Sequence, residues 1–260
     1  MVDVSIPCSG FVVGLVVGIT GIGGGSLMTP ILVLLFGIAP QTAVGTDLLF
    51  ACITKVFGAI VHGQKGAVDW QIVRRLSYGS LPAAAFTVIL LAYVGGGQIR
   101  SGVILSALGV ALLVTAAGLL VRKQLHEVGK RLRTENAVRF KQLQPGLTVI
   151  TGVGVGALVA LTSVGAGALG TVALVYLYPY RLRPVKLVGT DIAHAIPLTL
   201  VAGAAHLVLR NPDFVLLAKL LMGSIPGIVL GSTLSARIPE AFVRNAIAAI
   251  MVVVAVRLLV

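Results

Sequence analysis

Acidic residues are scarce in this chain, which has 8 Asp and Glu against 20 Lys and Arg in 260 residues. All charged residues together make up 11%, far below the roughly 25% of a soluble domain, whereas 57% of the residues are hydrophobic. This composition excludes an ordinary soluble domain and indicates an integral membrane protein. The basic excess does not indicate a nucleic-acid partner, because most Lys and Arg residues stand at the ends of apolar runs, as topology signals do.

Cysteine is also rare, since only Cys8 and Cys52 are present and both lie in apolar segments. A disulfide framework or a metal site is therefore not expected. The apolar runs do not alternate polar and apolar residues with period two, which excludes the strands of a β-barrel. HExxH, Walker and GxSxG signatures are missing as well. We predict a protein that is not an enzyme and has no cofactor.

Long apolar runs are abundant, and several approach the roughly 20 residues that cross a bilayer as a helix. These runs cover residues 76–94, 101–121, 187–209, 214–236 and 241–260. Helices are the expected form, because every backbone polar group in lipid must be paired within its own segment or barrel. The sequence therefore predicts an all-α, polytopic membrane protein.

Nearly the whole chain is a duplication of one unit. TGIGGGSLMTP from Thr20 matches TSVGAGALGTV from Thr162, and PQTAVGTDLL from Pro40 matches PVKLVGTDIA from Pro184. We assign residues 1–121 and 145–260 to two membrane repeats and residues 122–144 to a polar linker. The linker has Glu127 and Glu135 but also the basic residues Arg122, Lys123, Lys130, Arg131, Arg133, Arg139 and Lys141. By the positive-inside rule we place it in the cytoplasm.

The first segment of each repeat is too long for one crossing. Residues 4–36 and 146–178 would each make a helix of about 50 Å, against a hydrocarbon core of roughly 30 Å, and each has a glycine cluster at its centre. We predict that each segment forms a re-entrant hairpin of two half-helices. Three further crossings per repeat would then invert the second copy relative to the first. Loop charges favour this inverted arrangement over parallel repeats of four crossings each.

The glycine clusters predict a binding site. Non-helical backbone at membrane depth is tolerated where it is buried in protein or lines a wet cavity, and N–H groups at helix N-termini attract anions. Close packing of helices through small residues is the alternative interpretation. The residues expected to face a small anion are Gly21, Gly23, Gly24, Gly25 and Ser26 in the first copy and Ser163, Gly165, Gly167 and Ala168 in the second.

Three motifs carry a family resemblance. GIGGGSLMTP at 21–30, VGTDLLF at 44–50 and GAIVHGQKGAVDW at 58–70, with a degenerate second copy, resemble the sulfite exporter TauE/SafE family of membrane permeases, also called TSUP. The resemblance covers essentially the whole chain. It implies a secondary transporter that moves sulfur-containing anions, such as sulfite or organosulfonates including sulfoacetate, across the cytoplasmic membrane, mostly outward. In the second copy, Ala166 and Ala168 replace Gly24 and Ser26.

Two VGTD motifs add Thr46 and Asp47 in the first copy, and Thr190 and Asp191 in the second, to the predicted substrate site. We expect the aspartates to cap helices that begin at residues 46 and 190. Ion or proton coupling is a second interpretation, and it is compatible with the first.

Lys55 lies close to mid-membrane, where burial of a charge costs at least roughly 2.5 kcal/mol. We predict that its partner is an anionic substrate or Asp47, with snorkelling or a structural ion pair as alternatives. An imidazole titrates near neutral pH, so proton coupling is a candidate role for three histidines, although a histidine at a helix end is more often a cap or an interface residue. The three are His62, His194 and His206.

Taken together, these features predict an exporter in the inner (cytoplasmic) membrane that holds a sulfite or sulfonate anion between its two repeats. A channel or carrier for another small anion is the main alternative. A membrane-embedded enzyme would need a defined nucleophile, and a carrier of divalent cations would need more carboxylates than Asp47 and Asp191. The expected partners are the anion and the lipid bilayer, and faces of small residues are compatible with a homodimer.

Overall fold

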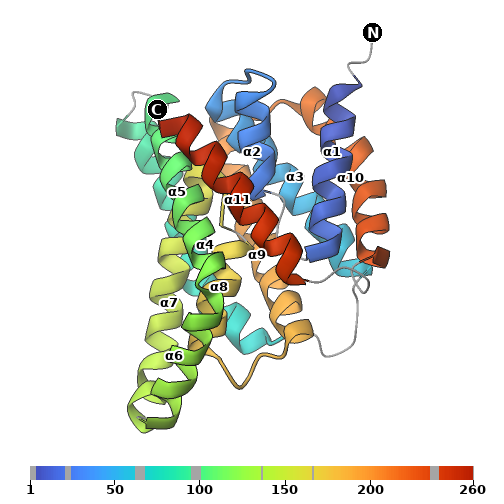
Figure 1. Ribbon diagram of the computed structural model, residues 1–260. Helices are drawn as coiled ribbons and strands as arrows, with labels where there is room; N and C mark the ends of the chain where they lie inside the picture. Colours follow the sequence, from blue (N-terminus) through green and yellow to red (C-terminus); the bar gives the residue numbers. More distant parts are fainter. Residues whose placement is uncertain are drawn as a thin grey trace.

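The computed structural model describes residues 4–20, 25–61, 68–94, 101–135, 137–165, 167–234 and 240–259. Within these ranges all regular secondary structure is helical (Figure 1), which confirms the predicted all-α class. The first helices are α1 (Ser5–Thr20), α2 (Gly25–Leu34), α3 (Pro40–Val61), α4 (Trp70–Val94) and α5 (Ser101–Leu120). They are followed by α6 (Arg122–Glu135), α7 (Ala137–Thr162), α8 (Ala168–Leu177), α9 (Pro184–Val208), α10 (Phe214–Leu234) and α11 (Glu240–Leu259).

Six helices within the described residues are long and apolar enough to cross a membrane. The spans are Pro40–Ile60, Trp70–Tyr93, Gly102–Leu120, Phe140–Thr162, Val185–Val208 and Phe214–Gly231. Two further apolar helices, over Ser5–Ile19 and Ala168–Leu177, are shorter. This pattern is that of a multi-pass membrane protein.

The second long segment is broken near its glycine cluster, as predicted, whereas residues 21–24, the matching stretch of the first segment, lie outside the described residues. α1 ends at Thr20 and α2 begins at Gly25, while α7 ends at Thr162 and α8 begins at Ala168. In the second break the backbone enters the left-handed region at Ser163 (φ 58°) and Gly165 (φ 105°), which stops a right-handed helix. α2 and α8 have 10 residues each, so each is about 15 Å long, half of a bilayer core.

The polar linker is helical almost throughout its described residues. Residues 122–135 form α6, and α7 begins at Ala137 within the expected linker. Good helix formers fill this stretch, and α6 has two ion pairs between successive turns, Lys130–Glu127 at 2.9 Å and Arg131–Glu135 at 2.7 Å. The helix before the second break, α7, consequently has 26 residues, so the expectation of two half-helices was wrong for this copy.

Close contacts between helices occur in pairs, at positions that correspond to each other in the two sequence repeats. A Cβ atom added to Gly10 of α1 would lie 2.3 Å from the carbonyl oxygen of Leu220 in α10. At the matching positions, a Cβ on Gly152 of α7 would lie 2.4 Å from the carbonyl oxygen of Leu76 in α4. Glycine therefore allows each helix to pack directly against the backbone of a helix from the other sequence copy.

Two hydrogen bonds between the copies are matched in the same way. The hydroxyl oxygen of Thr46 accepts from the backbone N–H of Asp213 at 2.9 Å, and that of Thr190 accepts from the N–H of Asp69 at 3.0 Å. Figure 1 shows that α5 and α11, which hold matching places in the two copies, run in opposite directions, with the end of α11 beside the start of α5. Equivalent residues thus make equivalent contacts across the interface between the copies.

One of these matched aspartates also forms ion pairs. The carboxylate of Asp69, which is 5% exposed, accepts two hydrogen bonds from Arg181 at 2.7 and 2.8 Å, and Lys186 Nζ lies 3.7 Å from it. Burial alone would raise the pKa of Asp69, but the hydrogen bond and charge of Arg181 hold this pKa below its usual range. Asp213 at the matched position instead caps α10, accepting from the N–H groups of Val215 and Leu216.

We predict that Gly152→Ala lowers the unfolding free energy by about 1–3 kcal/mol, because the added methyl group overlaps the Leu76 carbonyl. Gly154→Ala in the same helix is the matched control, since a Cβ there meets nothing within 4 Å. Thermal unfolding of the purified protein in detergent measures both. Equal melting temperatures for the two variants would contradict the close α4–α7 contact.

We predict that Asp69→Asn destabilises the protein by about 1 kcal/mol at neutral pH, because two cations lose their anionic partner. The folded-state pKa of Asp69 is lowered, so its contribution is present above the unfolded value of about 3.9 and is lost as pH falls through the folded value. The difference between wild type and variant should therefore shrink below about pH 4.

Asp213→Asn is the control for this pair, since Asn also caps helices well and should change stability little. Thermal unfolding from pH 7 to pH 3 measures the three proteins. A pH-independent deficit for Asp69→Asn would show that the ion pairs are not its cause.

Candidate functional site

Asp47 is fully buried and is bonded to the short helix α2 rather than to its own helix. Its Oδ2 atom accepts hydrogen bonds from the hydroxyl of Thr29 at 2.5 Å and from the backbone N–H of Thr29 at 3.2 Å. Its Oδ1 atom is buried without a hydrogen-bond partner in the described part of the chain. One carboxylate oxygen is thus fixed by α2, and the other faces the interior.

The expectation that Asp47 and Asp191 cap their helices was wrong. α3 begins at Pro40 and α9 at Pro184, so both aspartates lie about two turns inside their helices. Proline is favoured in the first turn, where its missing N–H group has no partner to lose, and this preference places the helix starts before the VGTD motifs. The aspartates therefore present their carboxylates inside the membrane region, where charged groups are costly and commonly functional.

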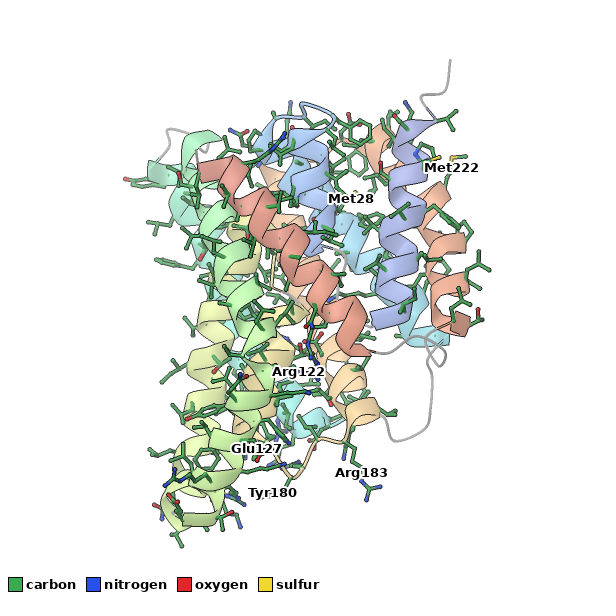
Figure 2. The ribbon with its side chains drawn as sticks, viewed as in Figure 1. Met28, Arg122, Glu127, Tyr180, Arg183 and Met222 are labelled. Carbon is green, nitrogen blue, oxygen red and sulfur yellow. The ribbon has the colours of Figure 1, made fainter. Side chains whose placement is uncertain are left out.

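Asp191 is 1% exposed, and among the described residues neither of its carboxylate oxygens has a hydrogen-bond partner. It lies against α8, because a Cβ added to Gly170 would be 2.5 Å from its Oδ1 atom. It also interacts electrostatically with Lys55 and with Arg122, the first residue of α6. Figure 2 places Arg122 near the centre of the molecule, whereas Glu127 lies closer to the end formed by α6.

Lys55 supplies a positive charge close to these two aspartates. Its side chain is buried, with 2% of the residue exposed, and it interacts electrostatically with Asp191 and Asp47. The snorkelling alternative is therefore wrong, because the ammonium group does not extend to the surface. α3 and α9 pack together, so the structure brings one lysine and two aspartates from both sequence copies into one buried cluster.

The second helix break contributes to the same cluster. The hydroxyl of Ser163, a residue that is 1% exposed, interacts with the Asp47 carboxylate but lies outside hydrogen-bond geometry, and it has no full hydrogen bond within the described residues. Gly167 precedes α8 without a side-chain cap, and Ala168 begins the helix in a buried position. The first-turn N–H groups of a helix lack intrahelical partners, and here they begin at a buried break.

Two of the candidate histidines have structural partners. His206 Nε2 lies 2.9 Å from the carbonyl oxygen of Ala160, and its Nδ1 lies 3.0 Å from the amide nitrogen of Asn211. A carbonyl only accepts and an amide nitrogen only donates, so the ring is neutral and held on both sides. His194 Nε2 lies 2.8 Å from the hydroxyl of Ser80 on α4.

The remaining predicted site residues are placed as follows. Thr46 and Thr190 use their hydroxyl oxygens to accept from loop backbone N–H groups, as described above, and Thr190 also donates to the carbonyl of Lys186 at 2.6 Å. Gly25 and Ser26 begin α2, and Gly165 takes a positive φ in the second break. Gly21, Gly23, Gly24 and His62 lie outside the described residues. Within those residues, no three His, Cys, Asp or Glu side chains come together as a metal site.

Sequence reasoning missed Thr29 and Arg122. Thr29 belongs to the quoted TGIGGGSLMTP motif, and its equivalent in the second copy is also a threonine, Thr171. That repeated threonine was the available signal. Arg122 had no separate signal, because it is the first of many basic residues in the linker.

Comparisons with known proteins identify one family and several relatives. The family described as "Sulfite exporter TauE/SafE" matches residues 6–258. The chain is 38% identical over 263 residues to the probable membrane transporter protein YjnA of Bacillus subtilis, covering 99% of this chain and 100% of that protein. It is 25% identical over 245 residues to the probable membrane transporter protein YdhB of the same organism, covering 91% and 92%. No solved structure matches.

We predict that Thr29→Val lowers the unfolding free energy by about 1.5–3 kcal/mol, because the buried Asp47 carboxylate loses a hydroxyl donor. Thr29→Ser keeps the donor and is the matched control, with a smaller loss from the missing methyl group. Thermal unfolding in detergent measures the difference. If the valine variant were as stable as the serine variant, the bond to Asp47 would contribute nothing.

Proposed function

Because the chain is a membrane transporter that belongs to the sulfite exporter TauE/SafE family, we propose that it is a secondary carrier of small sulfur-containing anions. Sulfite and organosulfonates such as sulfoacetate are the proposed substrates, and the cytoplasmic membrane is the proposed location. The anion binds at the helix breaks between the two repeats. The carrier exports the anion down its electrochemical gradient.

One observation carries this proposal: Lys55 is buried in one cluster with Asp47 and Asp191, and Ser163 of the second helix break interacts with Asp47 in the same cluster. A buried ammonium group needs negative charge close by, because the low-polarity interior screens it poorly. Asp47 and Asp191 supply that charge in the structure, and an oxyanion offers the same chemistry. Lys55 can therefore exchange a carboxylate partner for a substrate.

The backbone around Lys55 suits an anion as well. The buried N-terminus of α8 offers N–H groups with the positive end of its helix dipole, and Ser163 offers a buried hydroxyl without a full hydrogen bond within the described residues. A small oxyanion has three or four acceptor oxygens but no bulk, so a few donors on short helices can surround it.

Alternating access follows from the arrangement of the repeats. The site lies between the copies, and the contacts around it occur in matched pairs, such as Thr46–Asp213 and Thr190–Asp69. We propose that the repeats are inverted in the membrane, so that breaking one set of contacts opens the site to one side and breaking the other set opens it to the other.

We predict that Lys55→Met reduces sulfite transport at least tenfold, whereas Lys55→Arg keeps part of it, because the arginine retains the charge. Lys219→Met is the matched control, since Lys219 also interrupts an apolar run but is not part of the cluster. Uptake of labelled sulfite into proteoliposomes measures all three. Normal uptake by Lys55→Met would remove Lys55 from the site.

The same vesicles distinguish a carrier from a channel. A carrier saturates with substrate and shows counterflow of label against an excess of internal sulfite. A current that rises linearly with voltage, without counterflow, would contradict the proposal and favour an anion channel. A thermal-shift series with sulfite, sulfate, thiosulfate and short sulfonates orders the substrates, because a ligand that binds the folded state raises its stability.

A further inference from the structure

The two aspartates of the cluster hold equivalent places in the repeats, but their surroundings differ. Asp47 Oδ2 receives two hydrogen bonds from Thr29, which stabilise a negative charge. Asp191 receives no hydrogen bond on either oxygen from any described residue, although it is 1% exposed. The difference arises in the short helices, because Thr29 donates to Asp47, whereas the hydroxyl of Thr171 donates to the carbonyls of Gly167 and Ala168.

The charged groups around Asp191 are few. α3 contributes Lys55, and Arg122 approaches from the start of α6. Asp47, also on α3, shares Lys55 with it. On its own helix, His194 is bonded to Ser80 of α4, and α8 presents the backbone of Gly170. Among the described residues, only Lys55 and Arg122 therefore balance a negative charge on Asp191, and Lys55 also serves Asp47.

Anion binding changes this balance. If a substrate takes Lys55 as its partner, the cluster holds Asp47, Asp191 and the anion against one buried ammonium group and Arg122. Like charges at short range in a poorly screened interior cannot all persist. The group that gives up its charge most easily is the carboxylate without hydrogen bonds, and that is Asp191.

We propose that Asp191 takes up a proton when the anion binds and releases it when the anion leaves, so that one proton crosses with each anion. The proton comes from water on the side to which the site is open, forms an O–H bond on the Asp191 carboxylate, and returns to water on the other side. This inference rests on the proposed function. Linkage is reciprocal, so a substrate that favours protonated Asp191 must itself bind more tightly once Asp191 is protonated.

Infrared spectroscopy of the protein in lipid vesicles tests this directly, because a protonated carboxylic acid has a C=O band that a carboxylate lacks. The wild type should show such a band that disappears as the pH is raised. The band should be lost in Asp191→Asn and kept in Glu127→Gln, a surface variant on α6 whose side chain is 70% exposed. A band that survives in Asp191→Asn, or no titrating band in the wild type, would overturn the proposal.

Adding sulfite at constant pH supplies the second measurement. We expect the Asp191 band to grow, with about a tenfold change in the ratio of protonated to ionised Asp191, within the usual range of coupling between sites. Sulfite that stabilises the protein in a thermal shift but leaves the band unchanged would overturn the coupling and leave the proposed function standing. If the Asp191 band titrates with pH but sulfite does not bind, the substrate assignment would be overturned instead.

Two controls keep the result interpretable. If Asp191→Asn does not fold, the wild-type band can be assigned through Asp47→Asn, because removal of the other buried carboxylate should leave a band that belongs to Asp191. A band that is lost in Asp47→Asn would belong to Asp47 and would overturn the proposal. A band that responds to sodium rather than to pH would mean that the site takes a metal cation in place of the proton, and this would also overturn the proposal.

Discussion

A buried positive charge has to be balanced, and the centre of this protein is organised around the one on Lys55. The ammonium group is buried, with 2% of the residue exposed, so its stability depends on the negative groups that the fold places nearby. Asp47 comes from the same helix and Asp191 from its equivalent in the second copy. A transporter can use such a balance, because a ligand of the same sign as the carboxylates can replace one of them without leaving the lysine unpaired.

The duplicated sequence explains how these groups meet. The first segment of the second copy is interrupted between Thr162 and Ala168, and each copy packs against the other through glycines that admit a neighbouring backbone. This interruption places helix ends in the interior, where an intact crossing would offer only backbone groups that are already hydrogen-bonded. The copies have diverged in the cluster itself, because the first has Lys55 and a Thr29–Asp47 bond, whereas the second has Thr199 and an aspartate without hydrogen bonds among the described residues. This divergence gives two equivalent carboxylates different chemistry.

Much of the architecture was predictable, because composition, segment length and an internal repeat are properties of the sequence itself. The second helix break followed from an apolar run too long for one crossing. The helix starts did not, because the VGTD motifs look like caps and only the structure shows helices beginning at Pro40 and Pro184. The helical linker was missed because its polarity hides its helix propensity. The Thr29–Asp47 bond depends on how α2 packs on α3, and residue spacing carries no information about such a contact.

Direct localisation of a bound anion tests the central claim that the helix breaks and Lys55 form one site. A crystal structure with selenite, the heavier analogue of sulfite, would locate the anion through the anomalous scattering of selenium. We predict one strong peak within about 4 Å of Lys55 Nζ, the range of an ion pair, and beside Ser163 and the N-terminus of α8. A peak elsewhere, or none at this cluster at concentrations that inhibit sulfite transport, would contradict the claim.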